Sequence, residues 1–338
     1  MRNFHIPVFV PHKGCPHDCV FCNQKKITGQ TRDITPEDVA SITDEYLDSI
    51  SNIPGEKHIE IAFFGGSFTG IEQQKQIELL SVAHKYLADK KIHGIRCSTR
   101  PDYINDEILT MLRNYGMSVI ELGVQSTDEN VLKLANRGHS RDDVIRASKL
   151  IKEYDISLGL QMMTGLPGDT AEKSIATARD IISLEPDCVR IYPTLVMEDT
   201  HLMEMYKKGE YEPFGLKDTV ELCSELLVMF HRADIDVIRM GLQTTDNINA
   251  DTVIGPYHGA IGELCMGALV RKAVEKYVTN GEIQIFVHPS MVSATVGHKG
   301  ENRQYFAQKY NAVLKVMTDS SLGRNFIRIF DKTVDIYG

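Results

Sequence analysis

Near its amino end the chain reads Cys15-Pro16-His17-Asp18-Cys19-Val20-Phe21-Cys22, which gathers three cysteines at the spacing CxxxCxxC. The stretch follows the apolar run Ile6–Val10, which predicts a buried β-strand. The remaining cysteines are scattered through apolar segments and are expected in the core: Cys97, Cys188, Cys223 and Cys265. Crowded cysteines in a chain without signs of export predict metal ligands and not a disulfide framework. The loop after the first strand is therefore a predicted metal centre.

Two kinds of metal centre are compatible with this spacing. Three thiolates can hold three irons of a 4Fe–4S cluster and leave the fourth iron open to a cofactor or substrate. A zinc site is the alternative, with His12 or His17 completing a Cys₃His set. The sequence has no distant cysteine pair, and Phe21 is an aromatic residue that can stack on adenine. Both observations favour the cluster.

Composition and charge place the chain in a broad class. Of its 338 residues, 42% are hydrophobic and 25% are charged, as in a soluble globular protein. No apolar run approaches the roughly 20 residues that span a bilayer, and Met1–Val10 lacks the layout of a signal peptide. These features predict a cytoplasmic protein with no membrane partner. The net charge of −9 argues against a wholly basic nucleic-acid coat, although residues 281–338 carry seven basic against five acidic side chains.

Short apolar runs alternate with segments of helical period along most of the chain. The expected strands are Ile6–Val10, Ile59–Phe64, Ile95–Ser98, Ser118–Gly123, Ser157–Met162, Cys188–Tyr192 and Asp236–Met240. Thr35 followed by Pro36 predicts the start of one of the helices between them. The alternation predicts parallel strands with right-handed crossovers. We expect an α/β fold, a partial or full (β/α) barrel over residues 1–245, with a doubly wound sheet as the alternative and the chemistry at the carboxyl ends of the strands.

The cysteine loop resembles the signature of the radical S-adenosylmethionine (SAM) superfamily, CxxxCx-aromatic-C. The segment Phe63–Phe68, which contains Gly65 and Gly66, resembles the family's Gly-Gly motif, where bare backbone approaches the methionine amino group of SAM. Ser67 stands where the family often has Glu. The resemblance implies a 4Fe–4S cluster on Cys15, Cys19 and Cys22, with SAM on the fourth iron. It also implies a 5′-deoxyadenosyl radical and an electron donor such as ferredoxin or flavodoxin.

Later segments resemble the radical SAM core of the Elongator catalytic subunit, a tRNA wobble-uridine modifying enzyme. They are Ser98–Tyr103, Glu121–Ser126, Asn136–His139, Ile191–Val196 and Tyr206–Tyr211. Together the resemblances place the following residues at the SAM pocket: Phe21, Gly65, Gly66, Ser67, Thr99, Arg100, Gln125 and Gly165. Ser98 replaces a Glu of that family, and no acetyl-CoA loop of an acetyltransferase domain is found. Lys91 matches a lysine used near acetyl-CoA, but a solvated surface lysine is the alternative interpretation.

The tail, residues 281–338, has its own pattern and follows a connecting segment, residues 246–280. Strand, helix, Gly297-His298-Lys299-Gly300, helix and strand are expected in that order. This is the layout of a KH module, in which a GxxG loop clamps the nucleotide backbone. A plain helix-turn-helix connection is the alternative. The tail is therefore a predicted RNA-binding appendage.

Three functional hypotheses follow. The first is a radical SAM enzyme that acts on RNA, and specifically on a tRNA base. The second retains the radical chemistry but has a small molecule or a peptide as substrate. The third is a non-catalytic, zinc-stabilised RNA-binding protein.

Overall fold

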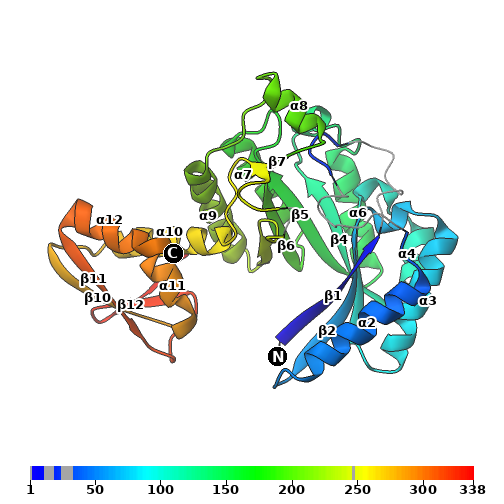
Figure 1. Cartoon of the computed structure of the whole chain (residues 1–338), viewed down its shortest axis with the longest axis horizontal. Coiled ribbons are helices and arrows are strands. Elements are labelled where there is room, and N and C mark those ends of the chain that lie inside the picture. Colours follow the sequence, from blue (N-terminus) through cyan, green and yellow to red (C-terminus); the bar gives the residue numbers. More distant parts are fainter. Residues whose placement is uncertain (1, 11–18, 24–32, 246–247) are drawn as a thin grey trace.

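The computed structural model describes residues 2–10, 19–23, 33–245 and 248–338. Its centre is a curved sheet of seven parallel strands (Figure 1). The strands are β1 (Arg2–Val10), β2 (Lys57–Gly65), β3 (Gly94–Thr99), β4 (Met117–Gln125), β5 (Ser157–Thr164), β6 (Cys188–Pro193) and β8 (Asp236–Met240). Their order in the sheet follows the chain without reversal, β1-β2-β3-β4-β5-β6-β8. This confirms the (β/α) barrel, in its partial form, and excludes the doubly wound alternative, whose strand order reverses.

Amphipathic helices cover the outer face of this sheet. They are α2 (Pro36–Ser51), α3 (Gln73–Ala88), α4 (Asp106–Asn114), α6 (Arg141–Glu153), α7 (Ala171–Ser183) and α9 (Leu216–Arg232). The predicted cap of α2 is confirmed, because the Thr35 hydroxyl accepts from the Asp38 N–H and the Asp38 carboxylate accepts from the Thr35 N–H. Every second residue of a strand points toward these helices, and those that do, such as Ile61 and Ile95, are fully buried. The residues between them face the inside of the half-barrel.

Short elements close the carboxyl end of the half-barrel. They are α5 (Glu129–Leu134), α8 (His201–Lys207), and the antiparallel pair β7 (Val196–Met197) and β9 (Val253–Ile254). A small apolar cluster joins Val20 to α5 and α8. The elements therefore position the described part of the cysteine loop, residues 19–23, over the sheet.

The tail forms a second α/β unit with its own apolar core. It consists of β10 (Gly281–Val287), α11 (Val292–Val296), α12 (Glu301–Tyr310), β11 (Ala312–Thr318), β12 (Phe326–Ile329) and β13 (Lys332–Asp335). The sheet order is β11-β10-β12-β13, with β10 parallel to β11. The helix α10 (Ile261–Glu275) contributes Cys265 to the barrel core and Val270 to the tail core. The sequence order of strands and helices expected for the tail is therefore present, and α10 connects it to the barrel (Figure 1).

Within the described residues, no helix has the length and apolarity needed to cross a membrane.

Candidate functional site

The carboxyl ends of the strands enclose a cavity of about 510 Å³. Side chains from all seven strands line it, together with the loops that follow them. Its position agrees with the rule that parallel α/β folds carry their chemistry at this end of the strands. Its volume is that of a site for a cofactor-sized molecule.

Two of the three predicted metal ligands reach this cavity. Cys19 is 3% exposed, Cys22 is half-buried, and both line the cavity together with Phe21. Backbone hydrogen bonds hold the loop in place, because the Val20 N–H donates to the Ala135 carbonyl and the Val20 carbonyl accepts from the N–H of Leu202. The third predicted ligand, Cys15, lies outside the described residues, as do His12 and His17 of the zinc alternative. The described cysteines are therefore positioned as a pair facing the cavity.

An arginine that the sequence reasoning did not assign to the site contacts one of these cysteines. Nη1 of Arg137 lies 3.6 Å from Sγ of Cys19, and Nη2 donates to the carbonyl of Gly123 over 2.7 Å. Arg137 is 8% exposed, and its buried Nε has no hydrogen-bond partner among the described residues. A Cβ at Gly123 would lie 2.7 Å from Nη2 of Arg137, so a glycine is needed for this approach. In the sequence, Arg137 stood out only as part of Asn136–His139, one of the segments that resemble the Elongator catalytic subunit.

The predicted glycine motif forms another wall of the cavity. Gly65 ends β2 with φ +101°, a conformation that favours glycine. The N–H of Gly66 donates to the carbonyl of Val10 at the end of β1. Gly65, Gly66 and Ser67 all line the cavity. Bare backbone thus faces the cavity at the place where the sequence analysis expected the methionine part of SAM.

Thr99 and Gln125 also line the cavity, at the ends of β3 and β4. The hydroxyl of Thr99 is hydrogen-bonded to that of Thr69 at 2.6 Å. Gln125 has φ +66° at a register shift between β4 and β5, and its Oε1 accepts a hydrogen bond from Gln161. Backbone strain of this kind in a residue other than glycine is concentrated at functional sites.

Two residues predicted for the SAM pocket do not line the cavity. Arg100 is 1% exposed and donates through Nε and Nη2 to both carboxylate oxygens of Asp102. Gly165 has φ +75°, donates to Asp169 and accepts from the Tyr211 hydroxyl. The structure therefore places Arg100 in a local ion pair and Gly165 in a buried turn.

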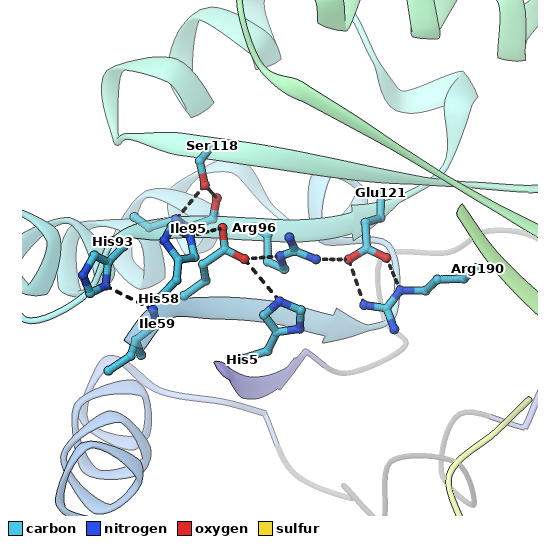
Figure 2. Close-up of polar contacts among 10 residues, drawn as sticks. His5, His58, Ile59, His93, Ile95, Arg96, Ser118, Glu121 and Arg190 are labelled. Carbon is cyan, nitrogen blue, oxygen red and sulfur yellow. Dashed lines mark hydrogen bonds and ion pairs between the residues drawn. The ribbon is translucent and has the colours of Figure 1, made fainter. Parts of the chain in front are cut away.

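Below the cavity, the inner face of the half-barrel carries a chain of buried charges, which Figure 2 shows. Arg96 joins Glu60 (2.7 Å) to Glu121 (2.9 Å), and Glu121 in turn binds Arg190 through both carboxylate oxygens. His5 adds a contact of 3.3 Å to Glu60. Although burial alone would raise the pKa of Glu60, the hydrogen bond from His5 and the charge of Arg96 lower it to about 2. Glu60 thus stays ionised, and these ion pairs hold His5 and Arg190 against the cavity that both line.

The residues at the cavity fit the cofactors that the resemblance implies. Cys19 and Cys22 are suitable soft ligands for iron. The glycine backbone, Thr99 and Gln125 supply hydrogen-bonding groups for a polar ligand, and the buried Nε of Arg137 is a donor without a partner among the described residues.

Comparisons with known proteins identify the family. Residues 9–181 match the model of the radical SAM superfamily and residues 186–271 that of its C-terminal domain. A tRNA uridine(34) acetyltransferase of Methanocaldococcus infernus is 30% identical over 65% of this chain and 48% of that protein. An uncharacterized protein of Methanocaldococcus jannaschii is 31% identical over 66% of this chain and 71% of its own length.

Solved structures agree on the fold. The Elp3 structure of Methanocaldococcus infernus has a TM-score of 0.63 at 24% identity and covers 80% of this chain and 63% of that one. The chain spans about half the length of the curated tRNA-modifying relatives that it matches. The family match over more than half of the sequence settles the class of protein. The chain belongs to the radical SAM superfamily, whose members use a 4Fe–4S cluster and S-adenosylmethionine.

Proposed function

We propose that this chain is a radical SAM enzyme that modifies a base in tRNA. The observation that carries the enzymatic part is the convergence of Cys19, Cys22 and the Gly65-Gly66 backbone on one cavity. The tRNA substrate is supported by the names of the relatives, tRNA uridine(34) acetyltransferase and Elongator complex protein 3. The proposal includes a cytoplasmic location and an electron carrier of the ferredoxin or flavodoxin type as partner.

Each wall of the cavity has a task in this proposal. Cys15, Cys19 and Cys22 hold the cluster, and Arg137 holds the side chain of Cys19. A 4Fe–4S cluster with SAM bound to it supplies a 5′-deoxyadenosyl radical for hydrogen abstraction. Because Gly65 and Gly66 have no side chains, the methionine part of SAM can approach their backbone closely.

The remaining cofactor contacts come from the next strands. Thr99 and Gln125 would orient the polar groups of SAM, and Phe21 would stack on its adenine. The apolar lining, which includes Met163 and Leu195, keeps water away from the reacting atoms.

The GxxG loop supports the RNA part. His298 and Lys299 are exposed, Lys299 has φ +51°, and Gly300 has φ +78°. Gly297 also has a packing role, because a Cβ there would lie 2.8 Å from the backbone nitrogen of Asn302. Packing alone, as in a plain connection between helices, therefore explains the glycine at position 297. The RNA clamp has to be tested at Lys299 and Gly300.

The enzymatic part is tested by anaerobic reconstitution with iron and sulfide, reduction with dithionite, and an assay for 5′-deoxyadenosine. We expect product from the wild type, none from Cys19→Ala, and wild-type iron content in the control Cys223→Ala, since Cys223 is buried in α9. A colourless protein with stoichiometric zinc would contradict the proposal and favour the zinc alternative.

A further inference from the structure

Two arginines lie opposite each other on neighbouring strands at the cavity. Arg190 of β6 and Arg239 of β8 are Cα partners in the sheet, and both line the cavity. Like charges on neighbouring strands repel each other. A pair of this kind at a cavity points to a function for the positive charge.

A β-bulge creates the pairing. The register between β6 and β8 shifts after Val189, which pairs with Val237, so that Arg190 pairs with Arg239 instead of Ile238. Ile238 is left 43% exposed. Bulges next to active sites re-aim side chains. Here the bulge replaces an isoleucine by an arginine on the cavity face.

The two guanidinium groups differ in their partners. Arg190 is bound by Glu121 and lies over the ring of Phe64 at 5.3 Å. Arg239 donates from Nε to the carbonyl of Gly241 at 3.0 Å, and no carboxylate of the described chain pairs with it. Its terminal Nη groups are therefore available as donors for a ligand.

The charged side chains in the described lining of the cavity have one sign. The charged side chains among its described lining residues are Arg137, Arg190 and Arg239, beside His5, and none of these described residues is Asp or Glu. The chain as a whole has a net charge of −9. A cationic cavity in an acidic protein selects an anionic ligand. Gln161, the Cα partner of Arg190 on β5, extends the row of donors across three strands.

We propose that Arg190 and Arg239 form a subsite for an oxyanion of the substrate, a phosphate or a carboxylate, beside the SAM pocket. The planar guanidinium presents two parallel donors that match such groups. The inference rests on the proposed function, because it requires the substrate to enter the cavity that holds SAM. In an RNA substrate, the group is a phosphate next to a flipped nucleotide. In a small-molecule substrate, it is the carboxylate or phosphate of that molecule.

The subsite is tested by calorimetric titration of the reconstituted, SAM-saturated and unreduced protein with inorganic phosphate and, separately, with acetate. Saturation with SAM fills the site for the carboxylate of SAM before the anion is added, so that the anion cannot bind there. We expect saturable binding by the wild type and a dissociation constant roughly tenfold higher in Arg239→Gln, as for the loss of a charge-assisted contact. Arg239→Lys keeps the charge and should recover part of the affinity.

The control is Arg179→Gln, which removes an exposed arginine of α7 and should bind as the wild type does. Preference for phosphate would indicate a nucleotide phosphate as the natural group, and preference for acetate a carboxylate substrate. Equal affinity of Arg239→Gln and wild type, or no saturable binding of either anion by the wild type, overturns the subsite. Because no reduction step is involved, this failure is distinct from a failure to cleave SAM.

Discussion

Arg137 and Cys19 are 118 positions apart in the chain, yet Nη1 of the arginine lies 3.6 Å from the sulfur of the cysteine. Hydrogen bonds and charges near the ligating sulfurs set the potential of an iron–sulfur cluster. Because reduction adds negative charge, a nearby guanidinium favours the reduced form.

We therefore expect Arg137→Gln to lower the midpoint potential of the reconstituted cluster. A shift of about 60 mV corresponds to a tenfold change in a one-electron equilibrium. Potentiometric titration followed by electron paramagnetic resonance measures it. Arg179→Gln, exposed on α7, is the control for a general charge effect. An unchanged potential in Arg137→Gln would mean that the contact does not persist with the cluster bound.

The buried charge chain should contribute strongly to stability. Glu121 binds both Arg96 and Arg190, so Glu121→Gln leaves the buried Arg190 without a carboxylate partner in the described chain and Arg96 with Glu60 alone. Loss of one partner of a buried pair costs about 3 to 5 kcal/mol in the free energy of unfolding. The exposed pair Arg113–Asp155 is the control, and Asp155→Asn should cost about 0 to 1 kcal/mol. Urea unfolding of both variants measures the difference, and similar costs would contradict the assigned role of Glu121.

The same row of buried charges predicts that the stability of the protein depends on pH. The pKa of Glu60 is lowered from 4.5 to about 2 in the folded protein, so its contribution to stability is complete above pH 4.5 and is lost as the pH falls toward 2. The free energy of unfolding of Glu60→Gln should therefore approach that of the wild type as the pH falls through this window. Urea unfolding at several pH values tests this. A difference between the two proteins that does not change between pH 5 and pH 3 would show that Glu60 titrates normally.

The sequence predicted elements better than it predicted contacts between them. The apolar runs located all seven strands of the barrel, and Thr35 marked the start of α2. The choice between barrel and doubly wound sheet needed the structure, because local patterns do not encode strand order. Arg137 and the Glu60–Arg96–Glu121 chain were missed for a related reason, since their partners come from distant strands and loops. Arg100 was expected at the cavity, but a carboxylate two residues away, on Asp102, holds it elsewhere.

The two glycines of the tail loop should respond differently to substitution. A Cβ at Gly297 would meet the backbone nitrogen of Asn302 at 2.8 Å, whereas nothing lies within 4 Å of one at Gly300. Gly300→Ala should cost only the left-handed backbone penalty of about 1 to 2 kcal/mol, and Gly297→Ala more. Thermal unfolding of both variants measures the order. Equal costs would show that the Asn302 backbone moves aside and that packing does not require Gly297.

The RNA clamp makes its own prediction, which depends on charge and not on folding. Lys299 is exposed and has no carboxylate partner in the described chain, so Lys299→Glu should leave the thermal unfolding temperature unchanged. If this side chain contacts a tRNA phosphate, the reversal should weaken tRNA binding and reduce the slope of log affinity against log salt by about 1. The matched control is Lys217→Glu, an exposed lysine at the start of α9 in the barrel, which should keep wild-type affinity. Filter binding at several salt concentrations measures both. If Lys299→Glu binds tRNA with wild-type affinity and salt slope, the tail loop is a plain connection, and the tRNA contacts of the proposed enzyme have to come from the cationic cavity and its rim.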